Sequence, residues 1–376
     1  MTRIAVCSSL TETATANYFV RALKNLGHDT VVLSDLTRSS VDVEISSFDY
    51  VGFALNKIKF TPDLFLFIEG GSMQLFPRGL QDLSCLTAWY GIDTHMAYEK
   101  HLCISRLFDV TFVAQKQYVD RLRDDGIRNV FWLPLGFDSS ILPVESLERI
   151  YDVSFVGSTN PSVHPERGAY IKQISEHFPN HLFVSSASPV EMGRIYSQSK
   201  IVFNKSVNND LNMRYFEALG AGACLVTDPI IENGVGDIFK RGEDFFEYED
   251  GKSLVKAMEK LLTNPNLLNQ VSERVRKKIL ENHTYDHRAG EVLEVTQLLG
   301  KLKPPNFLDY FAVYIYLGLF PLALSAAAHC FSINGKYGLR KLVESKLIMS
   351  TLVLLAGAAK AGLALNNVVR RIFGGK

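Results

Sequence analysis

The stretch from residue 200 to residue 228, KIVFNKSVNNDLNMRYFEALGAGACLVTD, restricts the possible folds more than any other part of the chain. It begins with an apolar run, residues 201–203, that has the length of a buried strand. A polar segment rich in asparagine follows, and residues 213–219 then predict a short helix that ends at glycine. Residues 224–227 predict a second buried strand. Together they make a βαβ unit, whose ligand-binding edge lies where the first strand ends and the helix begins.

Two oppositely charged residues, Arg214 and Glu217, lie one helical turn apart on that edge. Arginine binds phosphate through a planar fork of donors, and a carboxylate can accept hydrogen bonds from two ribose hydroxyls. The pair therefore predicts a sugar-nucleotide site. The structural alternative is an ion pair on the helix surface, which contributes about 0.2–0.5 kcal/mol. The asparagine-rich entry and the glycine-rich exit favour the binding site.

The first half of the chain alternates predicted strands and helices. Strands are predicted over residues 4–6, 30–33, 49–53, 63–68, 86–90, 109–114 and 130–133, and helices over residues 14–26 and 115–123. This alternation predicts a doubly wound sheet. Ser8 and Ser9 occupy the first strand–helix loop, where a dinucleotide fold carries G-x-G-x-x-G, so NAD or FAD is disfavoured at this position.

Polar residues follow two of these strands. Asp93 and His95 come directly after the strand at 86–90, and Glu69 follows the strand at 63–68. Because ligands bind at the carboxyl ends of such strands, Asp93 and His95 are candidates for positioning an acceptor or transferring a proton. The alternative for each is a helix cap or a surface turn.

The second half has the same alternation. Predicted strands cover residues 150–156 and 182–184 ahead of the opening unit, and predicted helices cover residues 169–178, 189–197, 252–262, 266–282 and 285–299. Gly157 and Ser158 follow the first strand, where backbone N–H groups can bind an anion, and Arg167 can reach the same space. An ordinary turn beside an exposed arginine is the alternative. Neither half has an acidic pair at metal-ligand spacing, so no metal is required.

Composition limits the remaining classes. A chain of 376 residues can form two or three domains, and its net charge of zero disfavours general nucleic-acid binding. The five cysteines show no C-x-x-C spacing, which favours a reducing compartment and disfavours zinc. The first ten residues, MTRIAVCSSL, indicate a strand rather than a signal peptide, so we expect the body in the cytoplasm.

The last part of the chain, residues 301–376, differs from the rest. It carries ten basic and two acidic residues, a net charge of +8 against −8 for residues 1–300. Residues 310–331 contain no Lys, Arg, Asp or Glu, which is long enough for a bilayer span. One interpretation is a helical hairpin that contacts the cytoplasmic face of a membrane through residues 307–376. The other is a helical module that packs on protein.

Several stretches of the second half carry a family resemblance: DVSFVGST with Arg167, KIVFNKS, MRYFEALGAGACLVTD, FKRGEDFFEYED and HTYDHR. With these, residues 150–300 resemble the glycosyltransferase-like domain of the CgeB/YkvP spore-maturation group, within the GT-B glycosyltransferases. The first half is similar more loosely, through PDLFLFIE, WYGID, FDVTFVA and LPLGFD. The resemblance implies an α/β GT-B fold: two Rossmann-like doubly wound domains facing a cleft, residues 1–145 for the acceptor and 146–300 for the donor, with an apolar, basic helical tail at 301–376.

The resemblance also implies roles for residues. Glu217 would hold the donor ribose, and backbone amides near Gly157 and Gly222, with Arg167 and Arg214, would hold its diphosphate. Ser158, Asn204 and Asn209 complete the expected donor site. Many retaining relatives carry a sugar-contacting glutamate where this chain has Asn209, with Asp210 beside it.

The resulting hypothesis is an enzyme, a retaining glycosyltransferase that moves a sugar from a nucleoside-diphosphate donor to a hydroxyl of a glycan, lipid-linked or protein acceptor. It would use neither metal nor cofactor, and it would serve polysaccharide or cell-envelope synthesis. Asp93 or His95 would orient or deprotonate the acceptor. Two alternatives stay open: a non-catalytic protein that binds nucleotide sugars, which Asn209 favours, and a nucleotide-sugar epimerase, which needs several carboxylates in the cleft.

Overall fold

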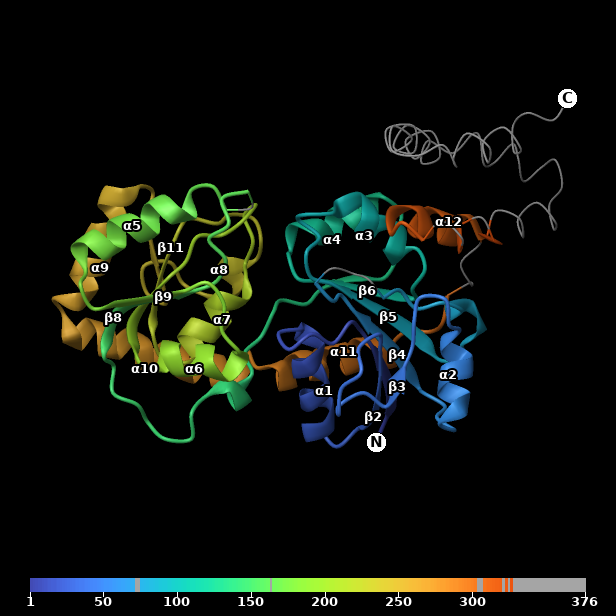
Figure 1. Cartoon of the computed structure of the whole chain (residues 1–376). Coiled ribbons are helices and arrows are strands. Elements are labelled where there is room, and N and C mark those ends of the chain that lie inside the picture. Colours follow the sequence, from blue (N-terminus) through green and yellow to red (C-terminus); the bar gives the residue numbers. More distant parts are fainter. Residues whose placement is uncertain (72–74, 163, 303–306, 320–321, 324, 327–376) are drawn as a thin grey trace, which may run out of the picture. The chain divides into compact units, whose positions relative to one another are not determined.

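The computed structural model describes residues 1–71, 75–162, 164–302, 307–319, 322–323 and 325–326 (Figure 1). The chain divides into two compact units. The first contains residues 1–101 and 108–302 and carries two parallel β-sheets, while the second contains residues 102–107 and the residues from 303 onward.

The first sheet has the strand order β3-β2-β1-β4-β5-β6-β7, and every neighbouring pair is parallel. Its strands are β1 (Arg3–Cys7), β2 (Asp29–Ser34), β3 (Val43–Glu44), β4 (Leu64–Ile68), β5 (Leu86–Gly91), β6 (Val110–Val113) and β7 (Val130–Trp132). The helices of this part are α1 (Thr15–Asn25), α2 (Val51–Lys57), η1 (Leu80–Asp82), α3 (Tyr98–Ser105), α4 (Gln117–Asp124) and η2 (Ser139–Ile141). Strand β4 is buried along its whole length, as its continuous apolar sequence requires in a sheet covered on both faces.

One predicted strand of this half is wrong. Residues 49–53 were expected to be extended, but the helix α2 begins at Val51. Its buried residues, Val51, Ala54 and Leu55, have the three- and four-residue spacing of a helix face. A short apolar run does not separate a strand from a helix when it is considered alone, because the deciding residues lie beyond it.

The second sheet is also parallel, with the order β12-β11-β10-β8-β9. Its strands are β8 (Tyr151–Val156), β9 (His181–Val184), β10 (Ser199–Phe203), β11 (Cys224–Thr227) and β12 (Phe246–Glu247). The helices are α5 (Arg167–His177), α6 (Pro189–Ser197), α7 (Met213–Gly220), α8 (Val235–Ile238), α9 (Gly251–Leu262), α10 (Pro265–Asn282) and α11 (Tyr285–Gln297). The sheet extends to one side through β9 and to the other through β10, so its topological switch point lies between β8 and β10.

The two sheets are joined by packing as well as by the chain. Helix α11, although late in the sequence, packs on α1 of the first sheet, with the Tyr285 ring 5.0 Å from Tyr18 and 5.4 Å from Phe19 between centroids. Two backbone hydrogen bonds connect the segment at Phe137 to the start of α11. The Phe137 N–H donates to the His283 carbonyl, and the Tyr285 N–H donates to the Phe137 carbonyl. Gly220, at the end of α7, lies against the Phe137 ring with no room for a side chain.

The predicted helical tail, residues 301–376, lies mostly outside the described residues. Within it, α12 (Phe307–Tyr316) is helical. None of the helices in the described ranges combines the length and the apolar character needed to cross a membrane.

Candidate active site

A cavity of about 380 Å³ opens at the carboxyl ends of strands from both sheets. It brings together five residues that the sequence predicted: Asp93, His95, Arg167, Arg214 and Glu217. The rest of its lining consists of Met96, His164, Val207, Asp210, Asn212 and Met213. The residues that follow β5 form one wall, and the loop after β10 with the first turn of α7 forms the other.

Arg214 occupies the switch point of the second sheet. Its guanidinium donates to the Val156 carbonyl at the end of β8 (2.7 Å), to Asn204 Oδ1 at the end of β10 (2.6 Å) and to the Tyr196 hydroxyl (3.2 Å). Gly157 gives this guanidinium its space, because a Cβ there would lie 2.7 Å from Arg214 Nη2. All three acceptors are neutral, so they fix the position of the charge without neutralising it.

Arg167 is held in the same manner. The buried guanidinium donates to the carbonyls of Ser158 (2.6 Å) and Lys205 (2.7 Å). Arg167 and Arg214 both lie over the Phe155 ring, at 5.2 and 4.6 Å from its centroid. Burial, together with the neighbouring Arg214, lowers the pKa of Arg167 to about 10. Within the part of the chain that the structure describes, neither arginine forms a direct ion pair with a carboxylate, although Asp93, Asp210 and Glu217 line the same cavity.

Glu217 lies one turn after Arg214 on α7 and also lines the cavity. Burial raises the pKa of its carboxyl to about 7, although Arg214 acts in the opposite direction. The surface ion pair that was the structural alternative is absent between these two described residues, because the Arg214 donors are directed to Val156, Asn204 and Tyr196 instead. The Glu217 carboxyl is therefore free to accept hydrogen bonds from a ligand.

On the opposite wall, Asp93 and His95 belong to a loop that a buried network holds. Glu69 Oε2 accepts from the backbone N–H groups of Ile92 (2.6 Å) and Asp93 (2.8 Å). Its other oxygen lies 3.0 Å from His101 Nε2. Burial alone would raise the pKa of Glu69, but His101 and the two backbone donors hold it below its usual range. Glu69, predicted only as a possible ligand residue, acts on the site by fixing this loop.

Asp210, which follows Asn209 in the sequence, lines the cavity. Burial raises the pKa of its carboxyl to about 6, with His95 and Gln115 acting in the opposite direction and Asp93 adding to the rise. Gln115 Nε2 donates to Asp210 Oδ1 at 2.9 Å. The sequence indicated Asp210 as a candidate, because an acidic residue in a loop after a strand end can bind a ligand. It gave no such indication for Gln115.

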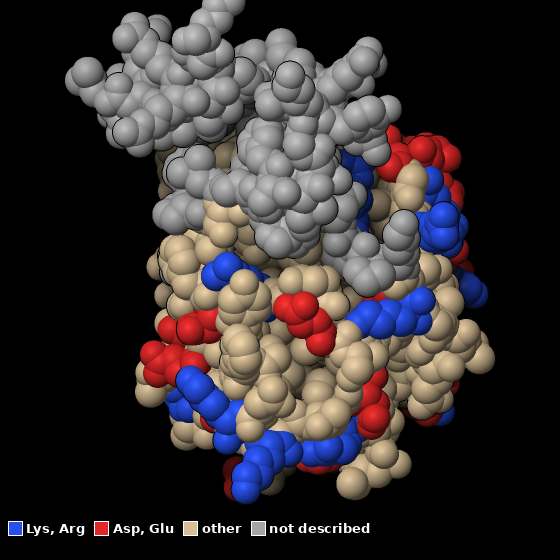
Figure 2. All heavy atoms as spheres, turned by 90° about the vertical axis from the view of Figure 1, so that its right-hand side faces the viewer, with Lys and Arg blue, Asp and Glu red and all other residues tan. Residues whose placement is uncertain are grey.

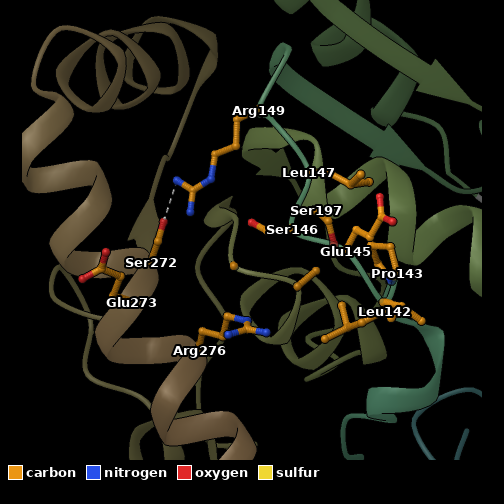
Figure 3. A pocket seen from close by; sticks show the side chains of 13 residues that line it. Leu142, Pro143, Glu145, Ser146, Leu147, Arg149, Ser197, Ser272, Glu273 and Arg276 are labelled. Carbon is orange, nitrogen blue, oxygen red and sulfur yellow. Dashed lines mark hydrogen bonds between the residues drawn. The ribbon is translucent and has the colours of Figure 1, made fainter.

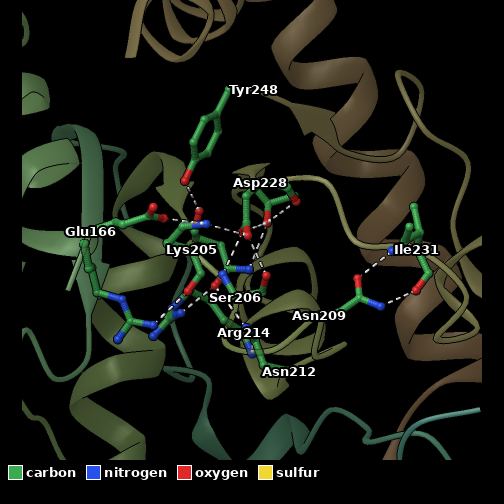
Figure 4. A network of polar contacts seen from close by, with 12 residues as sticks. Glu166, Lys205, Ser206, Asn209, Asn212, Arg214, Asp228, Ile231 and Tyr248 are labelled. Carbon is green, nitrogen blue, oxygen red and sulfur yellow. Dashed lines mark hydrogen bonds and ion pairs between the residues drawn. The ribbon is translucent and has the colours of Figure 1, made fainter. Parts of the chain in front are cut away.

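The other predicted donor residues lie outside the cavity lining. Asn204 is buried and orients Arg214, while Ser158 contributes its carbonyl to Arg167. Asn209 points away from the site: its Nδ2 donates to the Ile231 carbonyl, and its Oδ1 accepts from the Ile231 N–H at 2.7 Å (Figure 4). Both Asn208 and Asn209 adopt positive φ, 47° and 63°, which turns the chain so that Asp210 reaches the cavity instead.

Gly222 lies at the opposite end of α7 from Arg214, so the expected contact with a diphosphate there is not supported by its position. Its N–H donates to the Leu219 carbonyl at 3.1 Å as part of the helix end. It lines a second cavity, of about 400 Å³, into which Arg149 and Arg276 extend (Figure 3). The carbonyls at the end of α7 give this region a partial negative charge, which the two arginines offset.

Comparisons with known proteins agree with this architecture. The family model described as "Glycosyl transferase-like" matches residues 142–294. The Anabaena protein HepE, solved in complex with UDP and glucose, superposes with a TM-score of 0.60 at 9% identity, covering 80% of this chain and 100% of that chain. An alpha-glucosyltransferase solved with UDP-glucose and DNA containing an abasic site gives a TM-score of 0.55 at 12% identity, over 79% of this chain and 99% of that chain.

A third structure, sucrose-phosphate synthase from Thermosynechococcus elongatus, has a TM-score of 0.54 at 11% identity, over 79% of this chain and 98% of that chain. The chain has a GT-B fold. Its second half is similar to the glycosyl transferase-like family model over residues 142–294. The predicted fold class is thus confirmed. No curated protein sequence matches the chain.

Outside the cavity, the GT-B body shows no single dominant charge on the face that Figure 2 displays, where basic and acidic side chains both occur. No group of three or more His, Cys, Asp or Glu side chains within the described ranges could hold a metal ion. Among the described residues that line the cavity, Arg167 and Arg214 are the arginines that could bind an anionic ligand, and His95 and His164 lie in the same lining.

Proposed function

We propose that this protein is a glycosyltransferase that moves a sugar from a nucleoside-diphosphate donor to a hydroxyl acceptor. The observation that carries the proposal is the pair of guanidinium groups, Arg167 and Arg214, held in one cavity by neutral acceptors alone. Unpaired buried charge is costly unless a ligand compensates it. A diphosphate supplies the charge and the geometry that two arginine forks bind.

The donor would lie with its diphosphate between the arginines and the amino end of α7. The amino end of that helix, with the positive end of its dipole, adjoins the cavity through Met213 and Arg214. Glu217 would accept hydrogen bonds from the ribose, which places the nucleoside along α7. The solved neighbours that bind UDP or UDP-glucose make a UDP-sugar the first donor to test.

The same arginines account for departure of the nucleoside diphosphate. As the glycosidic bond breaks, negative charge grows on the leaving oxygen, and preorganised guanidinium groups stabilise that charge more in the transition state than in the ground state. With two fixed positive charges already in place, we infer that the reaction does not depend on a divalent metal.

The acceptor would enter from the wall that carries Asp93 and His95. Either group can orient the attacking hydroxyl or take its proton. Asp210 replaces Asn209 as the candidate contact to the transferred sugar, since only Asp210 faces the cavity. Asp210 would thus provide the sugar-contacting carboxylate. Its apparent absence at position 209 had favoured a non-catalytic protein. We further propose retention of anomeric configuration, a glycan or lipid-linked envelope acceptor, and membership of the CgeB/YkvP group.

The proposal is tested by calorimetric titration of UDP and pyrophosphate into the wild type and three variants. We expect Arg167→Gln and Arg214→Gln to weaken binding of both ligands by about 10- to 100-fold, the range for hydrogen bonds to charged groups. Arg149→Gln, which removes a guanidinium from the second cavity, is the matched control and should bind like the wild type. Equal affinity in all four proteins would contradict the proposed site.

Turnover completes the test. Incubation with UDP-sugars should release UDP slowly even without acceptor, and NMR of the product reports its anomeric configuration. Chelation by EDTA should leave the rate unchanged. A rate that is abolished by EDTA and restored by Mg²⁺ would reject the metal-independent mechanism, while leaving the donor site intact.

A further inference from the structure

One fully buried side chain, Gln115, joins the two walls of the cavity. It follows β6 of the first sheet, and its amide Nε2 donates two hydrogen bonds. One goes to the Ile92 carbonyl at 2.6 Å, and the other goes to Asp210 Oδ1 at 2.9 Å. Ile92 directly precedes Asp93, so a single amide group connects the loop that carries Asp93 and His95 to the loop that carries Asp210.

The orientation of this amide is fixed by its partners. A backbone carbonyl and a carboxylate both accept, so the NH₂ end of Gln115 must face them. Its Oε1 is left buried without a hydrogen-bond partner among the described residues, which costs free energy. Rotating the amide by 180° would satisfy neither acceptor. The Gln115 amide therefore donates to both loops, while its own oxygen has no hydrogen-bond partner among the described residues.

The loop that bears Asp210 is also held from its other side. The Asn233 side chain donates to the Asn209 carbonyl at 2.6 Å, and the Lys116 N–H donates to the Asn233 carbonyl at 3.3 Å. The Asn209 side chain is paired with the Ile231 backbone. Asn209 is thus fixed on the second half of the chain, and the contact with Gln115 sets the direction of the next residue.

We infer that Gln115 is a positioning residue for glycosyl transfer: it holds the Asp210 carboxylate of one wall in register with Asp93 and His95 of the other. This inference rests on the proposed function. Gln115 itself does not line the cavity, so it acts through Asp210. The amide keeps the group proposed to contact the transferred sugar, Asp210, aligned with the groups proposed to direct the acceptor, Asp93 and His95. Donor binding at Arg167 and Arg214 does not need it.

The test compares Gln115→Leu, which has a similar volume and no donor, with Lys116→Met. Lys116 is the matched control because its side chain also joins the two halves, through an ion pair with Asp237 at 2.8 Å, yet reaches no cavity residue. We expect Gln115→Leu to lower kcat for transfer about 10- to 100-fold with the donor KM and the UDP affinity within twofold of wild type. Lys116→Met should stay within twofold throughout.

Two outcomes would overturn the inference. One is equal loss of transfer in both variants, which would mean that any link between the halves matters and not this amide. The other is a rise in donor KM that matches the fall in kcat/KM for Gln115→Leu, which would place its role in donor binding. Gln115→Glu adds a discriminating case, because a carboxylate cannot donate to Asp210 and should lose transfer as fully as leucine does.

A structural readout separates this inference from the proposed function. Hydrogen–deuterium exchange should rise in residues 91–96 and 205–212 of Gln115→Leu but not of Lys116→Met. Faster exchange in those segments supports the positioning role even if the wild type transfers no sugar, in which case the proposed function alone fails. Unchanged exchange in Gln115→Leu rejects the positioning role whatever the wild-type activity.

Discussion

Replacing Glu217 with glutamine should change how the stability of the protein depends on pH. The Glu217 carboxyl is buried beside an arginine whose donors are already engaged, and burial raises its pKa to about 7 from an ordinary value of about 4.5. In the unfolded chain the carboxyl regains its ordinary value. The folded state therefore binds a proton more tightly than the unfolded state, and folding is favoured by low pH at this position.

The sign and the size follow from linkage. Between the unfolded and folded pKa values, about 4.5 to 7, the folded state holds the proton and the unfolded state does not, so stability falls as pH rises. Each unit of pKa difference corresponds to about 1.4 kcal/mol. Part of the loss has already occurred at pH 5, so the Glu217 contribution should fall by roughly 2 to 3 kcal/mol between pH 5 and pH 8. Glu217→Gln has no titrating group and lacks this contribution.

Urea denaturation of both proteins across that range measures the difference. We expect the variant to gain stability relative to the wild type as pH rises from 5 to 8, with most of the change below pH 7. The exposed Glu249, as Glu249→Gln, provides the baseline for removing a carboxylate from the surface. Parallel profiles for wild type and Glu217→Gln would refute the reasoning, because they would mean that the carboxyl is well solvated or compensated by Arg214.

Two glycine substitutions test the packing around the site. Gly157→Ala places a Cβ 2.7 Å from Arg214 Nη2, so we expect UDP to bind at least fivefold more weakly by calorimetry; unchanged affinity would mean that the guanidinium position is not critical. Gly234→Ala combines φ of +92° with a Cβ 2.4 Å from the rigid Trp132 ring, and urea denaturation should show a loss of about 2–4 kcal/mol. Gly236→Ala, which meets open space, should change stability by less than about 1 kcal/mol, and an equal loss there would discount the clash.

Most of the fold could be predicted because the pattern that determines it is local. Buried parallel strands need continuous apolar runs, and the helices between them need an apolar face. A few consecutive residues are therefore enough to predict each element. The unit at 200–228 folds as expected, with β10, α7 and β11 in that order. The strand predicted at α2 was wrong because the first five residues of this helix carry no polar side chain. Such a run fits the buried positions of a strand as well as those of a helix.

That Arg167, Arg214 and Glu217 line one cavity could be predicted for the same reason. Arg214 and Glu217 share a helix that begins at the ligand edge, and Arg167 begins the helix that follows β8. Helical spacing and strand ends fix the direction of such residues. Gly222 was misplaced because a glycine after a helix serves the helix end as readily as a ligand, and its N–H is already used there.

The side-chain directions in the loop between β10 and α7 could not be predicted from the sequence. Neither strand nor helix periodicity applies to residues 204–212, and the left-handed conformations of Asn208 and Asn209 reverse which side chain faces inward. The choice between Asn209 and Asp210 depends on Ile231, whose backbone pairs with Asn209 across 22 positions of sequence. No spacing rule within the loop contains that information.

The link from Gln115 to Asp210 is still less visible in the sequence, since it spans 95 positions and joins two sheets. A buried glutamine after a strand has no chemical signature of its own, and its role depends on what the other half of the molecule brings to it. The proposed donor site is built within one half, whereas the proposed acceptor side draws residues from both. A single-half fragment that kept Arg167, Arg214 and Glu217 would therefore retain the groups proposed to bind a nucleotide. It would lack Gln115, Asp93 and His95, the residues proposed to direct an acceptor hydroxyl toward the sugar.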